Sequence, residues 1–226
     1  MSRPLAVVLG AGIGGTAVAQ ALAQDWFVVV VDRDESLARA LAESVGGEWA
    51  VVDLLDVDAV IRFRDDLLSR HGRVDAVVHL VGGWKGSASV DLDALAAWDA
   101  IAPGVFGTVR TTTVAFREPL EQSPSGRYVM VSSTAVAKPT AGNVAYATAK
   151  AASETWVRGL AHAFRNSPAR AIIVTVKALV DDRMRQADPA QEFPGYTDTR
   201  DLAAAIAGTL EESGPANGTR LDLTEA

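Results

Sequence analysis

The chain has 226 residues, of which 49% are hydrophobic and 22% are charged, and its formal net charge is −7. A chain of this length and composition can bury a sizeable core, and we predict a single domain over residues 1–226. It contains no cysteine, which excludes disulfide scaffolds, thiolate metal sites and cysteine nucleophiles. The acidic balance and the scattered basic residues argue against a nucleic-acid partner.

The hydrophobic segments also argue against a membrane protein. The longest uncharged apolar run, residues 27–31, is far shorter than the roughly 20 residues that a bilayer requires. The first apolar run, residues 5–9, leads directly into glycines and has no cleavage site, so we expect no signal peptide and a cytoplasmic location. His71, His79 and His162 lack metal-ligand spacing, so we expect no metal site.

Apolar β-branched runs alternate with alanine-rich helical patterns along the whole chain. This alternation predicts an α/β fold, a doubly wound parallel sheet of about seven strands with helices on both faces. In chain order we predict a strand at 5–9, a helix at 14–24, a strand at 27–31, a helix at 35–44, a strand at 48–52, a helix at 57–70, a strand at 75–81, a helix at 92–120, a strand at 127–131, a helix at 144–164, a strand at 171–176, a helix at 200–210 and a strand at 219–223.

Two segments depart from this regular pattern. Pro103 and Gly104 interrupt the helix at 92–120, and we expect a kink there because proline cannot donate to the helical ladder. Residues 181–199 are rich in Pro, Gly, Asp and Gln and are predicted to form one long irregular loop. A loop of this length inside a compact domain usually has a function, so we expect it to bind substrate.

A glycine-rich turn joins the first strand to the first helix. Gly10, Gly12 and Gly15 satisfy the pattern G-x-G-x-x-G, with Ile13 and Gly14 inside it. The first glycine permits a tight turn, the second lets a pyrophosphate approach the backbone, and the third lets helix and strand pack closely. The position of the pattern between strand and helix predicts a Rossmann-type dinucleotide-binding fold.

The end of the second strand carries an acid that bears on the choice of cofactor. Asp32 lies 22 residues after Gly10, where a carboxylate can bind the ribose hydroxyls, and its charge would repel a 2′-phosphate. Arg33 follows at once and can hold that phosphate if Asp32 turns aside. The sequence therefore favours NAD(H) and leaves NADP(H) open. Asp53, just after the third strand, is either an adenine contact or an ordinary acid at a strand end.

A tyrosine and a lysine lie four residues apart at the start of the predicted helix at 144–164. Tyr146 and Lys150 therefore share one helix face, and a nearby cation lowers the pKa of a phenol. The chain contains only three tyrosines and four lysines, so this spacing carries information. Ser133, 13 residues before Tyr146, is placed on the turn after the strand at 127–131, where its hydroxyl can bind a substrate oxygen.

Together, the glycine turn, Asp32, Ser133 and the Tyr146-x-x-x-Lys150 pair resemble the short-chain dehydrogenase/reductase family over essentially the whole chain. The resemblance implies that Tyr146 is the acid/base, that Lys150 lowers its pKa and binds the nicotinamide ribose, and that Ser133 orients the substrate oxygen. It implies hydride transfer between a nicotinamide and a small-molecule carbonyl or alcohol. The cofactor contacts implied are Gly10, Gly12, Ile13, Gly14, Gly15, Asp32, Arg33, Asp53, Leu54, Val81, Gly82, Gly83 and Lys150.

Several positions differ from the family's pattern. The glycine turn is two residues shorter, and His79 begins the segment where the family has Asn-Asn-Ala-Gly. Ile101 replaces the asparagine of the proton relay, Lys177 stands where a proline is usual, and Asp182 replaces the threonine that often holds the carboxamide. We interpret His79 as a hydrogen-bonded packing residue.

The segment around Trp84 resembles the corresponding segment of dihydropteridine reductases, which use the tyrosine and lysine without the serine. Trp84 either lines the substrate pocket, where it would stack on a flat ring, or plugs the loop against the core. Two alternatives to a carbonyl reductase therefore stay open: reduction of a flat heterocycle, and a cofactor-binding protein with little or no catalysis.

The resemblance also implies self-association. In the family the helices corresponding to residues 92–120 and 144–164 pack against a second copy, and these helices carry apolar residues that one sheet face would not cover, among them Trp156, Leu160 and Phe164. We therefore predict a homodimer or homotetramer.

Overall fold

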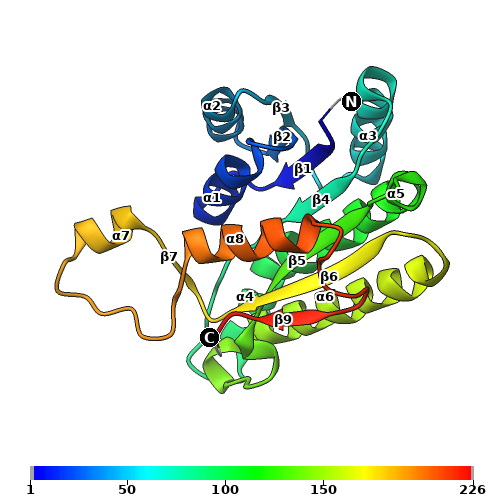
Figure 1. Ribbon diagram of the computed structural model, residues 1–226. Coiled ribbons are helices and arrows are strands. Elements are labelled where there is room, and N and C mark those ends of the chain that lie inside the picture. The colour runs from blue at the N-terminus through cyan, green and yellow to red at the C-terminus, as the bar shows by residue number, and fades with distance from the viewer. Residues whose placement is uncertain (1–2, 225–226) are drawn as a thin grey trace.

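The computed structural model describes residues 3–224, and its centre is a seven-stranded sheet in the order β3-β2-β1-β4-β5-β6-β9 (Figure 1). Every neighbouring pair in this sheet is parallel. The predicted doubly wound parallel sheet is therefore confirmed. Its strands span Leu5–Leu9 (β1), Phe27–Asp32 (β2), Glu48–Val51 (β3), Ala76–His79 (β4), Arg127–Ser133 (β5), Arg170–Val176 (β6) and Arg220–Asp222 (β9).

Helices cover both faces of this sheet. They span Ile13–Leu22 (α1), Glu35–Val45 (α2), Val57–His71 (α3), Leu92–Ala102 (α4), Thr108–Gln122 (α5), Val144–Ala163 (α6), Asp182–Ala187 (α7) and Thr199–Leu210 (α8). Side chains of α3, α5 and α6 pack on one face, and side chains of α1, α2 and α8 pack on the other. Within residues 3–224, no helix has the length and apolar character needed to cross a membrane.

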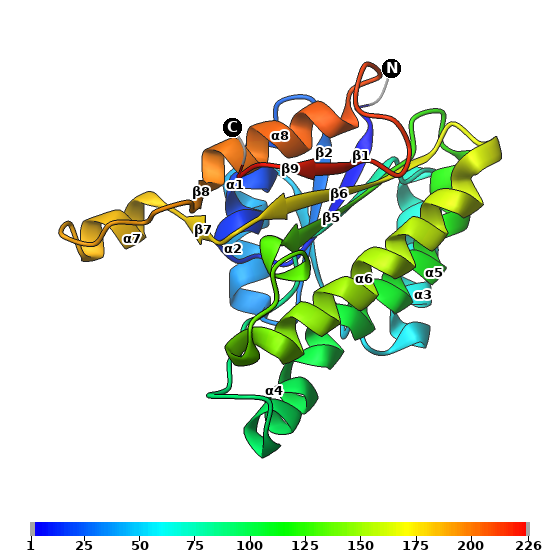
Figure 2. The same cartoon turned by 90° about the horizontal axis from the view of Figure 1, so that it is seen from below.

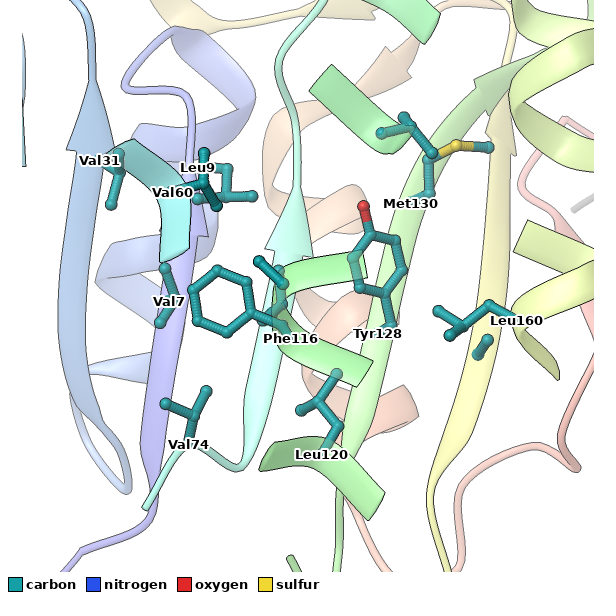
Figure 3. Close-up of a cluster of buried hydrophobic side chains, with 14 of the residues drawn as sticks. Val7, Leu9, Val31, Val60, Val74, Phe116, Leu120, Tyr128, Met130 and Leu160 are labelled. Carbon is teal, nitrogen blue, oxygen red and sulfur yellow. The ribbon is translucent and has the colours of Figure 1, made fainter. Parts of the chain in front are cut away.

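Alternate side chains of a strand point to opposite faces, so β1 supplies both layers of the core. Leu5, Val7 and Leu9 join the layer formed with α3, α5 and α6, whereas Ala6 and Val8 join the layer formed with α1, α2 and α8. Figure 3 shows part of the first layer, where Val7 and Leu9 of β1 lie beside Val60 of α3 and Phe116 of α5, and Tyr128 of β5 lies beyond Phe116. Each large side chain buried in this way contributes about 1.5–3 kcal/mol to folding.

Side chains of α6 differ in exposure from the predicted association surface. Leu160 is 7% exposed and Phe164 is 0% exposed, and both belong to the chain's own core. Their prediction as surface residues is therefore wrong, because α6 turns them toward the sheet. Trp156 is 42% exposed, and its indole Nε1 donates to Thr113 Oγ1 on α5 at 2.8 Å.

The predicted interruption of the helix over residues 92–120 at Pro103 and Gly104 is a π-helical turn, Pro103–Gly107, which joins α4 to α5. Thr108 Oγ1 donates to the Gly104 carbonyl at 2.7 Å, and Ser153 Oγ on α6 donates to the Val105 carbonyl at 3.1 Å. These side-chain hydrogen bonds satisfy carbonyl groups of the wider turn, so the chain stays helical through the proline.

Residues 181–199 are more ordered than the sequence predicts. They contain α7 and the short strand Thr197–Asp198 (β8), which pairs in parallel with Leu179–Val180 (β7). α7 begins after Asp181, whose carboxylate accepts the Met184 N–H at 2.9 Å. The prediction of a segment without regular structure is therefore wrong. Figure 2 shows α7 projecting away from the sheet.

The strand order of the sheet has its topological switch point at β1. The chain moves outward from β1 through β2 to β3 and then returns to place β4 on the other side of β1. In doubly wound sheets, the carboxyl ends of the strands at such a point form a crevice where ligands bind. The segments that follow β1 and β4 are adjacent here, since the Leu80 N–H donates to the Leu9 carbonyl at 2.9 Å.

Candidate active site

A cavity of about 880 Å³ opens at the carboxyl edge of the sheet. It brings together the glycine turn, the segment after β4, the end of β5 and the start of α6. The residues singled out from the sequence that line it are Gly12, Ile13, Gly14, Gly15, Val81, Gly82, Gly83, Ser133, Tyr146 and Lys150. Those that do not line it are Gly10, Asp32, Arg33, Asp53 and Leu54.

Two positions of the turn after β1 require glycine. Gly10 has a φ of +102°, and a Cβ there would lie 3.2 Å from the backbone of Leu80 and Val81. A Cβ on Gly15 would lie 1.8 Å from the Gly10 carbonyl oxygen, so α1 can pack this closely on β1 only without a side chain. A Cβ on Gly12 would meet nothing within 4 Å, so the backbone there faces open space.

The first turn of α1 offers a suitable environment for an anion. α1 begins directly after Gly12, which makes no side-chain cap, and its first turn contains no acidic residue. The first N–H groups of a helix have no partner within the helix and carry partial positive charge. This end of the cavity therefore fits the pyrophosphate of a dinucleotide.

Asp32 holds the glycine turn from the end of β2. Its Oδ2 accepts the Ala11 N–H at 2.7 Å, and its Oδ1 accepts the Asp34 N–H at 3.0 Å. Because each carboxylate oxygen can accept more than one hydrogen bond, the same group can still bind a ribose hydroxyl. Arg33 beside it is exposed. Asp32 therefore has a structural contact in addition to the cofactor contact predicted from sequence.

Asp53 and Leu54 have local partners outside the cavity. Asp53 Oδ1 accepts the Leu55 N–H at 2.9 Å, which is the arrangement of an ordinary acid at a strand end. Leu54 is buried, and its carbonyl accepts a hydrogen bond from Thr111 Oγ1 on α5. A contact between Asp53 and an adenine stays a prediction.

His79, at the end of β4, is 1% exposed and packs inside the fold. Its Nε2 lies 2.9 Å from Thr108 Oγ1, and its ring stacks on that of Tyr128. Burial lowers the pKa of His79 to about 3, and the nearby Lys150 charge acts in the same direction. A ring that is neutral and hydrogen-bonded agrees with its interpretation as a packing residue. Within residues 3–224, no group of metal-ligating side chains is large enough to hold a metal ion.

Ser133, Tyr146 and Lys150 come from two neighbouring elements. Ser133 is the last residue of β5 and not part of the following turn as predicted, because the pairing with β6 extends that far. Its Oγ accepts the Ala135 N–H at 3.2 Å. Tyr146 and Lys150 lie at the start of α6, and Lys150 Nζ is 6.0 Å from the centroid of the Tyr146 ring.

The Tyr146 phenol is largely buried at the start of α6, and its surroundings shift its pKa. Burial raises its pKa above the ordinary value, and the Ser133 hydroxyl acts in the opposite direction. The net shift is upward, because the loss of surrounding water outweighs the hydrogen bond with Ser133. The lowering of this pKa by Lys150 stays a prediction.

Lys150 is buried with its charge in contact with the strand. Its Nζ donates to the Val131 carbonyl of β5 at 2.8 Å. A Cβ on Gly82 would lie 3.7 Å from this nitrogen, so the ammonium stands directly beside the segment after β4. Burial lowers the pKa of Lys150 to about 8, while the Glu154 carboxylate raises it.

Glu154 is a buried carboxylate that the sequence reasoning missed. It accepts from Ser132 Oγ at 2.7 Å and forms ion pairs with Arg158 at 2.8 Å and Arg220 at 3.3 Å. The available signal was its spacing, since Glu154 follows Lys150 by four residues as Lys150 follows Tyr146. Glu154 therefore supports the lysine from one turn further along α6.

Trp84 lines the cavity and is 69% exposed. The alternative in which it plugs the loop against the core is therefore wrong. Its indole lies against Gly86, where a Cβ would be 2.8 Å from the ring. The Ser87 N–H next to it donates to the Gly142 carbonyl at 3.0 Å, which ties this segment to the approach to α6.

Among the cavity-lining residues that were not identified as site residues from the sequence are Lys138, Asn143 and Tyr196. Lys138 and Asn143 lie between β5 and α6, and Tyr196 lies just before β8. Their positions depend on how the loops fold over the edge of the sheet, which periodicity does not reveal. The scarcity of lysine was the one signal that pointed to Lys138.

Comparison with known proteins agrees with this geometry. A family model described as short chain dehydrogenase matches residues 4–192. The chain belongs to the short-chain dehydrogenase family. This short-chain dehydrogenase is 33% identical over 162 residues to an uncharacterized oxidoreductase of Mycobacterium tuberculosis, a match that covers 68% of this chain and 61% of that relative. The chain thus spans about three fifths of the length of that relative.

Solved structures of short-chain dehydrogenases share the fold. One from Shigella flexneri, solved with NADP, has a TM-score of 0.86 and 19% identity, and the match covers 100% of this chain and 98% of that chain. An oxidoreductase from Haemophilus influenzae, solved with bound NAD, has a TM-score of 0.83 and 17% identity, with 98% and 94% covered. At these identities the likeness shows a common fold.

Two departures of this short-chain dehydrogenase from the family's pattern have a structural basis. Ile101 is buried in an apolar cluster with Val105 and Ala149, and Tyr146 packs against it. Because the side chain at position 101 is apolar, it cannot hold the water of the proton relay. Asp182 begins α7 outside the cavity, is exposed and pairs with Arg200 at 3.2 Å.

Proposed function

We propose that this short-chain dehydrogenase is an NAD(P)(H)-dependent oxidoreductase that acts on a carbonyl or alcohol compound. The observation that carries the proposal is that Ser133, Tyr146 and Lys150 line the same cavity as the glycine turn. The open backbone at Gly12 and the required glycine at position 15 fit a nicotinamide dinucleotide at this edge of the sheet. The cytoplasmic location and the single domain over residues 1–226 remain part of the proposal.

Three residues of the chain have separate roles in the proposed proton transfer. The bound nicotinamide would supply or accept the hydride. In the reductive direction Tyr146 donates its phenolic proton to the substrate oxygen, since its raised pKa keeps that proton at neutral pH. The Ser133 hydroxyl donates a hydrogen bond to the same oxygen and orients it. Lys150 holds a positive charge beside the phenol, which favours the phenolate left after transfer.

We propose NAD(H) as the preferred cofactor, with NADP(H) as the alternative. The Asp32 carboxylate is fixed by the backbone of Ala11 and Asp34, and its negative charge would repel a 2′-phosphate bound there. Arg33 makes no ion pair within the described part of the chain and is the group that would support NADP(H). Relatives of the fold have been solved with each cofactor, so they do not favour either.

Oxidation of the reduced cofactor tests the proposal. We expect NADH to bind with a lower Kd than NADPH, and its absorbance at the nicotinamide band to fall when a panel of ketones and aldehydes is supplied. Absence of NADH and NADPH binding would contradict the cofactor assignment. Binding without turnover of any member of a broad panel would favour a cofactor-binding protein without catalysis.

Reduction of a flat heterocycle is a second candidate, favoured by the exposed indole of Trp84 on the cavity wall. An aromatic ring stacked on an indole gains about 0.5–1.5 kcal/mol beyond its buried area. Quinonoid dihydropterin and aliphatic ketones, assayed with wild type and Trp84→Ala, separate the two candidates. A loss of about tenfold in kcat/KM for the pterin alone supports this candidate, and equal losses for both substrates contradict it.

We also propose that the chain forms a homodimer or homotetramer. Leu92, Leu95, Val114 and Trp156 leave large apolar side chains exposed on α4, α5 and α6. Such side chains are usually covered in an assembly. Multi-angle light scattering at micromolar concentration should give a mass of two or four chains, and a monomer would contradict the proposal.

A further inference from the structure

The lysines of this chain are not scattered over its surface. Lys138, Lys150 and Lys177 all line the candidate catalytic cavity, and Lys85 lines an adjoining hollow that shares Trp84 as a wall. These are all four lysines of the sequence. Within residues 3–224, no aspartate, glutamate or arginine lines the cavity itself. A chain with a net charge of −7 therefore presents a cavity wall with only positive side-chain charge.

Lys138 and Lys177 are not neutralised by carboxylates. Neither forms an ion pair with any residue between 3 and 224. Lys177 Nζ donates to the Pro194 carbonyl at 2.7 Å and lies 5.8 Å from the centroid of the Tyr196 ring. These two contacts fix the direction of the Lys177 side chain while leaving its charge uncompensated.

Two acids of the segment that follows Lys177 are paired with arginines. Asp181 pairs with Arg183 at 3.2 Å, and Asp198 pairs with Arg185 at 3.2 Å. Arg200 pairs with Asp198 at 3.0 Å on the same side. No acid within residues 3–224 lines the cavity beside its lysines, and a concave site of one sign attracts a ligand of the other.

The position of these lysines separates them from the proposed pyrophosphate site. Lys138 lies in the connection that follows Ser133 at the end of β5, and Lys177 follows β6. The glycine turn follows β1, and β4 lies between β1 and β5. With neighbouring strands about 4.8 Å apart, the ends of β1 and β5 are about 10 Å apart. Lys138 and Lys177 thus belong to the side of the cavity that carries Ser133.

We propose that the substrate bears an anionic group, a carboxylate or a phosphate, and that Lys138 and Lys177 bind it. This inference rests on the proposed oxidoreductase function, because it assigns Ser133 and Tyr146 to the carbonyl of the same molecule. Both lysines are exposed on the cavity wall, so an anion can reach them without displacing a buried ion pair. Two ammonium groups on different loops also select a substrate by the distance between its carbonyl and its anionic group.

Matched pairs of probes test the inference. One pair is levulinate against methyl levulinate, and the other is dihydroxyacetone phosphate against dihydroxyacetone. Turnover gives kcat/KM for each probe, and calorimetric titration of the enzyme–NAD⁺ complex gives each Kd without requiring turnover. We expect the charged member of at least one pair to be preferred by wild type about tenfold or more.

The variants are Lys138→Gln, Lys177→Gln and the double variant. We expect the charged-to-neutral preference to fall about threefold in either single variant and to vanish in the double variant, with the Kd of NADH unchanged. Arg39→Gln is the matched control, because it removes one positive charge from an exposed ion pair with Glu43 on α2. It should leave the preference as in wild type.

Three results would overturn the inference. One is that wild type binds and turns over neither charged probe better than its neutral partner. Another is that the lysine variants weaken both members of a pair equally. The last is that they raise the Kd of NADH and leave the preference intact, which would assign the lysines to the cofactor. Failure of the proposed function has a different signature, since it would show as absent cofactor binding or absent turnover of every carbonyl.

Discussion

A β-carbon on Gly15 would stand 1.8 Å from the carbonyl oxygen of Gly10. These two glycines therefore fix how closely α1 approaches the end of β1. That approach places the first N–H groups of α1 at the cavity, and the rest of the site is arranged around this point.

Gly15→Ala should damage the fold locally, because the methyl group has nowhere to go. We expect a lower Tm and a rise of about tenfold or more in the Kd of NADH. Gly12→Ala is the matched variant, since a methyl group there meets nothing within 4 Å and the φ of −71° suits alanine. Gly12→Ala should keep the wild-type Tm and still raise the Kd of NADH. Equal thermal stability of the two variants would contradict this account of the turn.

Replacing Asp32 should shift the choice of cofactor. In Asp32→Ser the carboxylate no longer repels a 2′-phosphate, and Arg33 can bind that phosphate. We expect the ratio of kcat/KM for NADPH over NADH to rise about tenfold or more. Asp34→Ala is the control: Asp34 caps α2 by accepting the N–H groups of Ser36 and Leu37, so its loss should lower Tm and leave the ratio unchanged. A similar ratio in both variants would show that Asp32 does not select the cofactor.

Glu154 should set the alkaline limit of activity through Lys150. The pKa of Lys150 is about 8, and Glu154 raises it. Reduction that needs the ammonium and the protonated phenol should therefore weaken as pH rises through about 8. In Glu154→Gln the midpoint of this fall should move to lower pH, because the carboxylate that favours the charged lysine is gone. Glu43→Gln, in an exposed ion pair, is the control. A midpoint that stays fixed or moves upward would contradict this role.

The buried charge of Lys150 should destabilise the folded chain at neutral pH. Its pKa is about 8 in the folded chain against 10.5 for a free lysine, so the unfolded chain binds the proton more tightly. The cost is therefore complete below about pH 8 and disappears as pH rises above the unfolded value. Lys150→Met should raise the free energy of unfolding by about 1 kcal/mol or more at pH 7, and by less near pH 10. Urea unfolding at both pH values measures this, and a variant less stable than wild type at pH 7 would refute it.

The sequence predicts the parts of this molecule that depend on local pattern. The strand-helix alternation predicts the order of the elements, because burial on both faces of a parallel sheet requires continuous apolar strands. The spacing of Tyr146 and Lys150 predicts that they share a helix face, and the structure shows them at one cavity. The need for glycine at position 15 was also predicted, since the third glycine of G-x-G-x-x-G lets the helix pack closely on the strand.

Other features depend on contacts between distant segments and could not be predicted from the sequence. Glu154 is held by Arg220, 66 residues away, and by Ser132 on β5. The π-helical turn at Pro103–Gly107 depends on Ser153 of α6. The sign of the pKa shift of Tyr146 depends on how completely the fold removes water from the phenol. Each of these follows from which loops meet at the edge of the sheet.

The central claim, that the Tyr146 phenol performs the proton transfer, is tested most directly by Tyr146→Phe. The measurement is kcat for NADH oxidation with the best carbonyl substrate, together with the Kd of NADH. Tyr128→Phe is the matched control, because its hydroxyl is buried against Thr112 and does not line the cavity. We predict that Tyr146→Phe binds NADH as wild type does and loses turnover by about 1,000-fold, whereas Tyr128→Phe stays active. Wild-type turnover in Tyr146→Phe would contradict the account.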